Sequence, residues 1–203
     1  MKKDYIIRLE TEKEYEETEN LEREAFWNVY RPGALEHYVL HLYRNAEGFI
    51  KDLDLVIETD GKIVGHVMYA DSYIETETGR VKVATFGPYG VLPEYKGKGY
   101  GGALLRKSME MAKERGIKCL CITGRYELYK HFGFVLGKTV GITYKDDPDA
   151  DYFLVKELEN GFFGKVKGTY TDPETYFVDE KEAEEFDKKF PPKQKLKLPG
   201  QLA

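Results

Sequence analysis

The stretch that most constrains the fold is VLPEYKGKGYGGALL, residues 91–105, where four glycines separate an apolar run from a helical pattern. Glycine in a helix costs about 1 kcal/mol relative to alanine, so it is kept where the backbone must turn or approach another group closely. Gly97, Gly99, Gly101 and Gly102 therefore predict a strand–loop–helix unit whose amide groups are approached by a ligand.

Local patterns predict the elements around this unit. A capping box at Thr11 and Glu14 opens a helix, Asp60-Gly61 predicts a hairpin, and an apolar run at 117–124 predicts a buried strand. The full expected order is a strand at 4–9, helices at 11–27 and 34–45, three antiparallel strands between 53 and 92, a helix at 101–116, a strand at 117–124, a short helix ending at Gly133, and strands at 134–144 and 151–158. Beyond residue 159 we expect a hairpin, a polar helix at 180–190 and a Pro- and Lys-rich tail.

Composition narrows the class of protein. The formal net charge of -5 over 203 residues argues against nucleic acid or an anionic membrane as the main partner. No long apolar run follows the first lysines, so we expect no secretory leader and a cytoplasmic protein. Cys119 and Cys121 are expected to be buried, reduced thiols, and we expect no metal.

The glycines also spell G-x-G-x-x-G from Gly97 to Gly102, the pattern of dinucleotide-binding loops. That pattern requires an acidic residue about 20 positions later to hold the ribose. Counting on reaches residues 119–124, CLCITG, which contain no carboxylate. A GxxxxGK[ST] phosphate loop is also absent from the sequence, so both nucleotide readings are disfavoured.

A different resemblance fits two separate blocks. Residues 96–101, KGKGYG, resemble the [Q/R]-x-x-G-x-[G/A] motif of the GNAT superfamily of N-acetyltransferases, and residues 128–134, LYKHFGF, resemble its F-Y-x-x-x-G-F segment. The resemblance covers residues 4–158. It implies an α+β fold with a mixed, mostly antiparallel central sheet flanked by helices and splayed at the cofactor cleft. We expect a GNAT-like domain at 1–158 and a C-terminal extension at 159–203.

The resemblance implies acetyl-CoA as co-substrate and assigns its contacts. The backbone of the strand before the loop would pair with the pantetheine arm, and the loop would hold the diphosphate. The implied cofactor-binding residues are Tyr89, Gly90, Val91, Lys96, Gly97, Lys98, Gly99, Tyr100, Gly101 and Gly102. Lys96 departs from the family's Arg or Gln, but the main phosphate donors would be backbone N–H groups.

Tyr129 matches the family tyrosine that protonates the departing thiolate, with Tyr126 as the fallback. Proton transfer from a tyrosine (pKa about 10) to an alkyl thiolate (about 8.5) is uphill by about 2 kcal/mol, so a concerted transfer is expected. Taken outside its block, Tyr129 would be interpreted as core packing.

The proton acceptor is harder to find, because residues 81–93 contain no Asp, Glu or His. Candidates elsewhere are Glu24, Asp71, Glu75, Glu94 and His66, each of which is interpreted more simply as a surface group or a satisfied strand residue. By resemblance, Glu22 and Glu24 lie on the substrate side of the cleft.

The leading hypothesis is an N-acetyltransferase that moves an acetyl group to a primary amine by direct attack in a ternary complex. The acceptor would be a small-molecule or peptide amine. Two alternatives stay open: a non-catalytic acyl-CoA-binding or sensing module, and an interaction protein that works through its tail. The oligomeric state is also open, with a homodimer common in the family.

Overall fold

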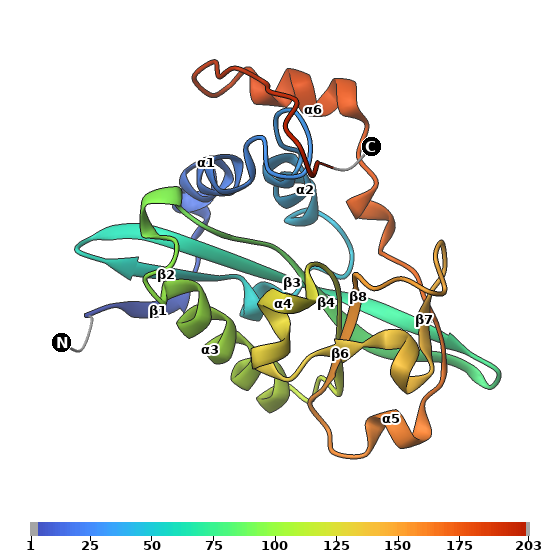
Figure 1. Cartoon of the computed structure of the whole chain (residues 1–203). Coiled ribbons are helices and arrows are strands. Elements are labelled where there is room, and N and C mark those ends of the chain that lie inside the picture. Colours follow the sequence, from blue (N-terminus) through green and yellow to red (C-terminus); the bar gives the residue numbers. More distant parts are fainter. Residues whose placement is uncertain (1–3, 202–203) are drawn as a thin grey trace. The chain divides into compact units, whose positions relative to one another are not determined.

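The computed structural model describes residues 4–201 and consists of a mixed sheet flanked by helices (Figure 1). The strands are β1 (Ile6–Leu9), β2 (Leu55–Thr59), β3 (Lys62–Thr76), β4 (Gly79–Val91), β5 (Cys119–Thr123), β6 (Val135–Leu136), β7 (Ile142–Tyr144), β8 (Phe153–Glu157) and β9 (Gly168–Tyr170). The helices are α1 (Tyr15–Phe26), α2 (Glu36–Tyr43), α3 (Tyr100–Glu114), α4 (Tyr126–Tyr129), α5 (Phe162–Lys165) and α6 (Glu180–Asp187).

The sheet runs in the order β1-β2-β3-β4-β5-β8-β6, and β9 adds to it by pairing with β3 and β7. Most of the pairs with a described register are antiparallel, while β4–β5 and β7–β9 are parallel. The register of β4 with β5 covers only Ala84 with Leu120 and Thr85 with Cys121, although β4 continues to Val91. The predicted α+β fold class is therefore confirmed, and β4 extends past its short pairing with β5.

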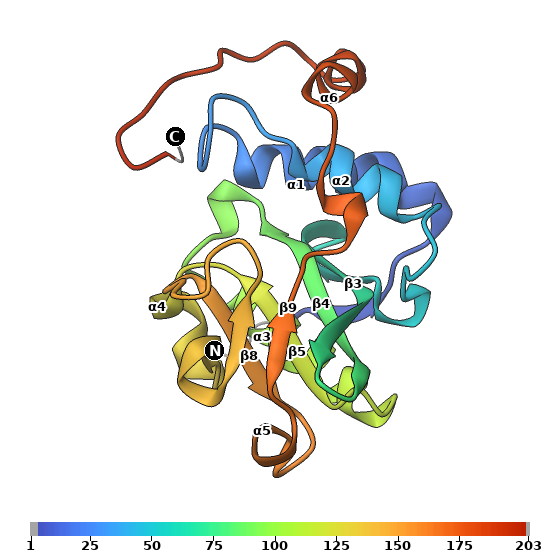
Figure 2. The same ribbon diagram turned by 90° about the vertical axis from the view of Figure 1, so that its right-hand side faces the viewer.

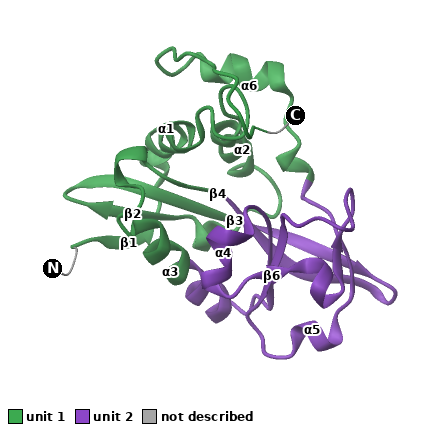
Figure 3. Cartoon of the chain, viewed as in Figure 1, with its two compact units in different colours: residues 1–68, 88–107, 174–203 green, residues 69–87, 108–173 purple. Residues whose placement is uncertain are grey.

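The chain divides into two compact units (Figure 3). Unit 1 contains residues 1–68, 88–107 and 174–203, and unit 2 contains residues 69–87 and 108–173. Helix α3 and strands β3 and β4 each contribute residues to both units.

Unit 1 carries α1 and α2. The predicted capping box is present, since Glu14 accepts from the backbone N–H of Thr11 at 2.8 Å, and it opens a single 3-10 turn before α1. The hairpin predicted at Asp60-Gly61 is also confirmed, with both residues at positive φ between β2 and β3. A small apolar cluster of Leu21, Val56, Ile63 and Leu92 packs α1 against this part of the sheet.

Unit 2 has an apolar and aromatic core. Phe153 and Tyr170 stack with ring centres 5.0 Å apart, on strands β8 and β9 (Figure 2). Cys119 and Cys121 are free and buried in the same core, as predicted. The hairpin expected after residue 159 is wrong: that stretch forms the short helix α5 and the single strand β9, which pairs with β3 and β7.

The last segment of the chain packs on the helices of unit 1. Helix α6 buries Ala183 and Phe186 in a cluster with Tyr38 of α2, and Figures 1 and 2 show α6 beside α2. The side chain of Asp179 caps α6 by accepting from the backbone N–H groups of Lys181 and Glu182. None of the helices in residues 4–201 combines the length and hydropathy that a membrane span needs.

Candidate active site

The glycine loop lies between β4 and α3 in unit 1. A 3-10 turn at Pro93–Tyr95 leads into Gly97 and Gly99, whose φ angles of 73° and 88° are left-handed. Helix α3 begins at Tyr100, and the N–H of Ala103 donates to the carbonyl of Gly99 at 3.1 Å. The first N–H groups of a helix lack partners within the helix and form the positive end of its dipole, which favours an anion.

The protein's own backbone conformation and packing explain three of the four glycines without a ligand. The φ angles of Gly97 and Gly99 disfavour any side chain, and a Cβ on Gly101 would lie 2.7 Å from the hydroxyl of Tyr89. A Cβ on Gly97 or Gly99 would meet nothing within 4 Å, so the space beside both residues is open. The glycine count alone therefore does not require a ligand.

The two lysines of the loop differ. The ammonium group of Lys96 donates to the carbonyl of Ala25, near the end of α1, at 2.7 Å. Burial lowers the pKa of Lys96, and the nearby Glu22 opposes that shift. The Nζ of Lys98 lies 5.2 Å from the ring centre of Tyr95. Both lysines are exposed, but the ammonium group of Lys96 is held against α1 by its hydrogen bond to Ala25.

Tyr89, Gly90 and Val91 form the end of β4. Gly90 is buried under α1: a Cβ there would lie 2.3 Å from Oε2 of Glu22 and 2.9 Å from the Cβ of Ala25. Burial raises the pKa of Tyr89. Only glycine allows α1 to approach β4 this closely.

Tyr129 belongs to unit 2, at the end of α4. Its half-buried ring makes edge contacts with Phe86 and Phe134, with ring centres 5.9 Å and 5.6 Å away. A Cβ on Gly124 would lie 2.8 Å from this ring. Tyr126, the fallback acid, is 36% exposed. Tyr129 therefore packs against two aromatic rings while its own side chain stays partly exposed.

The proposed bases fall into two groups. Four of them form surface ion pairs: Glu24 with Lys193 at 2.7 Å, Asp71 with Lys82 at 2.6 Å, Glu75 with Arg80 at 2.6 Å, and Glu94 with Lys62 at 3.1 Å. His66 differs, because it is fully buried and its Nδ1 lies 2.9 Å from Glu22.

Sequence reasoning missed Glu22 as a partner of His66, since 44 residues separate them. The available signal was a histidine inside the apolar strand IVGHVMY, which needs buried polar partners.

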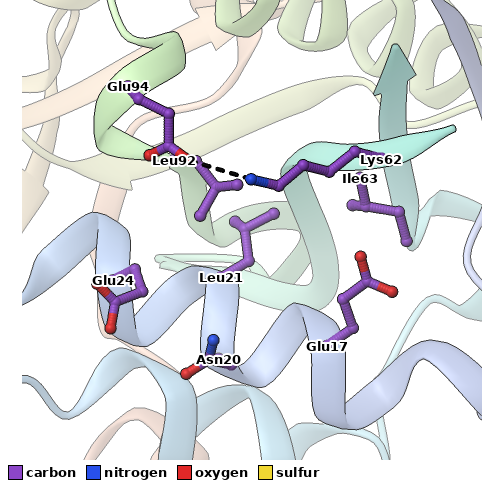
Figure 4. Close-up of a pocket in the computed structure, with 8 residues that line it drawn as sticks. All are labelled: Glu17, Asn20, Leu21, Glu24, Lys62, Ile63, Leu92 and Glu94. Atoms are coloured by element: carbon purple, nitrogen blue, oxygen red, sulfur yellow. Dashed lines mark hydrogen bonds and ion pairs between the residues drawn. The ribbon is translucent and has the colours of Figure 1, made fainter. Parts of the chain in front are cut away.

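A hollow of about 250 Å³ opens on unit 1 beside α1 (Figure 4). Its floor is apolar and its rim acidic, and one ion pair, between Lys62 and Glu94, crosses it. The lining residues are Glu17, Asn20, Leu21, Glu24, Lys62, Ile63, Leu92 and Glu94.

Comparison with known proteins decides the family. The model of the acetyltransferase (GNAT) domain matches residues 6–137. The chain belongs to the GNAT acetyltransferase family. Two curated relatives are the uncharacterized N-acetyltransferases YjhQ of Escherichia coli and MJ1207 of Methanocaldococcus jannaschii. YjhQ is 30% identical over 40% of this chain and 45% of its own length, and MJ1207 is 34% identical over 45% of this chain and 40% of its own length. The matched stretches thus span less than half of either relative.

Solved structures share the GNAT fold. The GNAT family N-acetyltransferase YhbS of Escherichia coli, solved in complex with CoA, superposes with a TM-score of 0.74 at 21% identity over 85% of this chain and 91% of that chain. A GNAT family acetyltransferase of Brucella melitensis, in complex with acetyl-CoA, gives a TM-score of 0.69 at 22% identity over 86% of this chain and 99% of that one. Identities this low show likeness of fold.

Proposed function

We propose that this GNAT chain transfers the acetyl group of acetyl-CoA to a primary amine, by direct attack of the amine in a ternary complex. The observation that carries the proposal is the glycine loop at the start of α3, which places the positive end of the helix dipole directly after β4. The CoA and acetyl-CoA in two structures of the same fold support it.

The diphosphate of acetyl-CoA would be held by the loop from Lys96 to Gly102. Backbone N–H groups of Gly99, Tyr100, Gly101 and Gly102 would donate to it, and Lys98 would add charge. The pantetheine arm would pair with the backbone of Tyr89, Gly90 and Val91, where β4 continues beyond its register with β5.

Attack of a neutral amine on the thioester carbonyl forms the C–N bond, and collapse of the tetrahedral intermediate breaks the C–S bond. One proton must leave the amine and one must reach the departing thiolate. We assign the second role to Tyr129, following its place in residues 128–134, and a backbone N–H at the end of β4 would stabilise the oxyanion.

The second candidate function is an acyl-CoA sensor that binds without turnover. It is favoured by the absence of a carboxylate or histidine from residues 81–93 of β4 and its lead-out. A thiol-release assay with spermidine, kanamycin and phenethylamine, combined with calorimetric binding of acetyl-CoA, separates the two. Amine-dependent thiol release supports the transferase, and tight binding without release supports the sensor.

The role of Tyr129 has its own test. Tyr129→Phe should lower kcat by about 10²-fold with little change in KM for acetyl-CoA, because the hydroxyl acts only on the leaving group. Tyr152→Phe, at an exposed tyrosine of the same unit, serves as the matched control and should leave kcat unchanged. An unaltered kcat in Tyr129→Phe across several pH values would remove this tyrosine from the mechanism, and a loss in Tyr126→Phe instead would transfer the role.

A further inference from the structure

A chain of buried ionisable side chains lies directly behind Gly90, within unit 1. His66 of β3 is its centre and is fully buried. The Nδ1 of its ring lies 2.9 Å from Oε1 of Glu22, and its Nε2 lies 2.8 Å from Oδ1 of Asp54. Both ring nitrogens thus face carboxylates, so the ring is held in one orientation and can carry a proton between them.

This row of buried ionisable side chains continues away from β4. Asp54 hydrogen-bonds to Glu10, and both oxygens of Glu10 accept from the guanidinium of Arg44 at 2.9 Å. Arg44 also donates to Glu19 at 2.7 Å, which contacts His41 at the surface. The polar atoms of Glu10, Asp54 and His66 lie within 4.8 Å of one another, but Arg44 already occupies Glu10, so we interpret the cluster as an ion-pair network.

The charges in this network favour a bound proton. Its carboxyl groups are Glu10, Glu19, Glu22 and Asp54. The buried cations beside them are Arg44 and His66, with Lys96 near Glu22, so the four carboxyl groups outnumber these cations and a neutral carboxyl group is favoured. Isolated charges are costly in a buried site, and a proton is the simplest remedy.

The pKa shifts agree with a proton bound to this network. Burial raises the pKa of Glu10 to about 7, and burial raises the pKa of Glu22 against the opposing effect of His66. Burial alone would lower the pKa of His66, but its hydrogen bonds to Asp54 and Glu22 outweigh this and raise it to about 10. Burial would raise the pKa of Asp54, and the hydrogen bond from His66 reverses the shift, so that it is lowered.

One oxygen of the network faces the end of β4. Oε2 of Glu22 is buried and contacts the backbone of Gly90, without a hydrogen bond of normal geometry among the described residues. A single Cβ added to Gly90 would come within 2.3 Å of this oxygen. A carboxylate oxygen can accept more than one hydrogen bond, so Oε2 keeps acceptor capacity beside the end of β4.

We propose that Glu22 is the proton acceptor for the attacking amine, and that His66 and Asp54 hold it in place. This inference rests on the proposed acetyl transfer, because the amine would react beside the end of β4. The ammonium group of the acceptor gives its proton to Glu22 through one bridging water. The freed lone pair then forms the C–N bond, while the C–S bond breaks and the thiolate takes a proton from Tyr129. The nitrogen loses its second proton as the amide forms, and that proton returns to the Tyr129 oxygen through solvent.

Glu22 acts as a catalytic residue in this scheme, and His66 and Asp54 are positioning residues. The pH dependence of Glu22 is set by groups on every element around it. They are His66 of β3, Tyr89 of β4, Glu36 of α2, Arg44 directly after α2, and Lys96 of the loop. The two cations among them, with His66, favour the ionised carboxylate that accepts the proton.

The test compares Glu22→Gln with wild type in the full chain, with thiol release read for the amine of the panel that wild type uses best. Glu22→Gln should lower kcat by about 10²-fold near pH 7 while acetyl-CoA affinity is kept. Its rate should then rise about tenfold per pH unit toward the pKa of the acceptor amine, because solvent must deprotonate the amine. The wild-type rate should be flatter over the same range.

Glu16→Gln, on the exposed face of the same helix, is the matched control and should leave the profile unchanged. Asp54→Asn should show a smaller loss and a shifted pH profile, which a merely structural role would not produce. Thermal unfolding and calorimetric binding of acetyl-CoA establish that each variant is folded.

The two proposals fail differently. If wild type turns over none of the amines, both the acetyl transfer and the role of Glu22 fall. If wild type is active and a folded Glu22→Gln keeps its rate and pH profile, the role of Glu22 alone is overturned.

Discussion

The cores of the two units differ in kind. Among the described residues, the buried charged and histidine residues all belong to unit 1, namely Glu10, Glu19, Glu22, Arg23, His37, Asp54 and His66, and the side chain of Arg44 is buried there too. In unit 2 the buried polar side chains described are Ser72, Thr85 and Ser108, set among apolar and aromatic residues. Apolar packing is sufficient for the core of unit 2. The buried charges of unit 1 therefore need an explanation other than the packing of a core.

Buried ion pairs are weak evidence for stability, because the desolvation of each charge offsets the attraction between them. A network such as Glu22–His66–Asp54 is therefore better explained by chemistry than by folding. The hydrophobic core of unit 2 provides the reference against which this explanation can be tested.

The largest expected effect is that of Arg44→Met. Its side chain is 3% exposed and pairs with Glu10 and Glu19, so its removal leaves two buried carboxyls without a cation. We expect a loss of about 3–5 kcal/mol in the free energy of unfolding. The loss should be larger at pH 9 than at pH 5, because burial raises the pKa of Glu10 to about 7 and this carboxyl group can take up a proton at acid pH. Urea unfolding at both values measures it.

Phe153→Leu in unit 2 is the matched core substitution. It removes aromatic packing from a fully buried site and should reduce stability by about 2 kcal/mol at both pH values. Equal pH dependence in the two variants would erase the distinction between the cores.

The loss of stability at alkaline pH provides a second comparison between the two cores, through His66 of unit 1. The folded-state pKa of His66, about 10, lies above its unfolded value of 6.5, so its stabilising effect is complete below pH 6.5 and is lost as pH rises through 10. Wild type should therefore exceed His66→Gln in stability at pH 6, and the difference should shrink steadily up to pH 10. A constant difference over that range, in chemical unfolding, would mean that His66 is not held as a cation.

Several elements of the fold were predictable from local sequence patterns. The Asp60-Gly61 hairpin, the capping box at Thr11 and the strand–loop–helix around residues 91–105 each depend on neighbours in sequence, and all three are present. The polar helix expected at 180–190 is present as α6, Glu180–Asp187. The fold of residues 160–170 was not predictable, because β9 is a three-residue strand whose partners, β3 and β7, lie elsewhere in the chain.

The buried contacts of the candidate site could not be predicted either, because the partners are distant in the sequence. Glu22 and His66 are 44 residues apart, and Glu10 and Arg44 are 34 apart. Each looks like an ordinary helix or strand residue until the fold brings them together. The tail also makes contacts that its composition does not indicate. Residues 191–200 are exposed, yet the carbonyl of Gln194 accepts hydrogen bonds from the side chains of Trp27 and Asn28 at 3.0 Å.

The smallest expected change in stability accompanies the most direct test of cofactor binding. Gly99→Ala and Gly61→Ala both place a side chain at a left-handed φ, 88° and 71°, with nothing within 4 Å of the new Cβ. Each should cost about 1 kcal/mol of stability from backbone strain. Only Gly99 lies in the loop that we assign to the diphosphate.

Calorimetric titration of the two variants and wild type with acetyl-CoA therefore decides the central claim. The account predicts at least about tenfold weaker binding for Gly99→Ala, equivalent to 1.4 kcal/mol, and wild-type affinity for Gly61→Ala. Equal affinity in all three proteins, or binding to none of them, would contradict it.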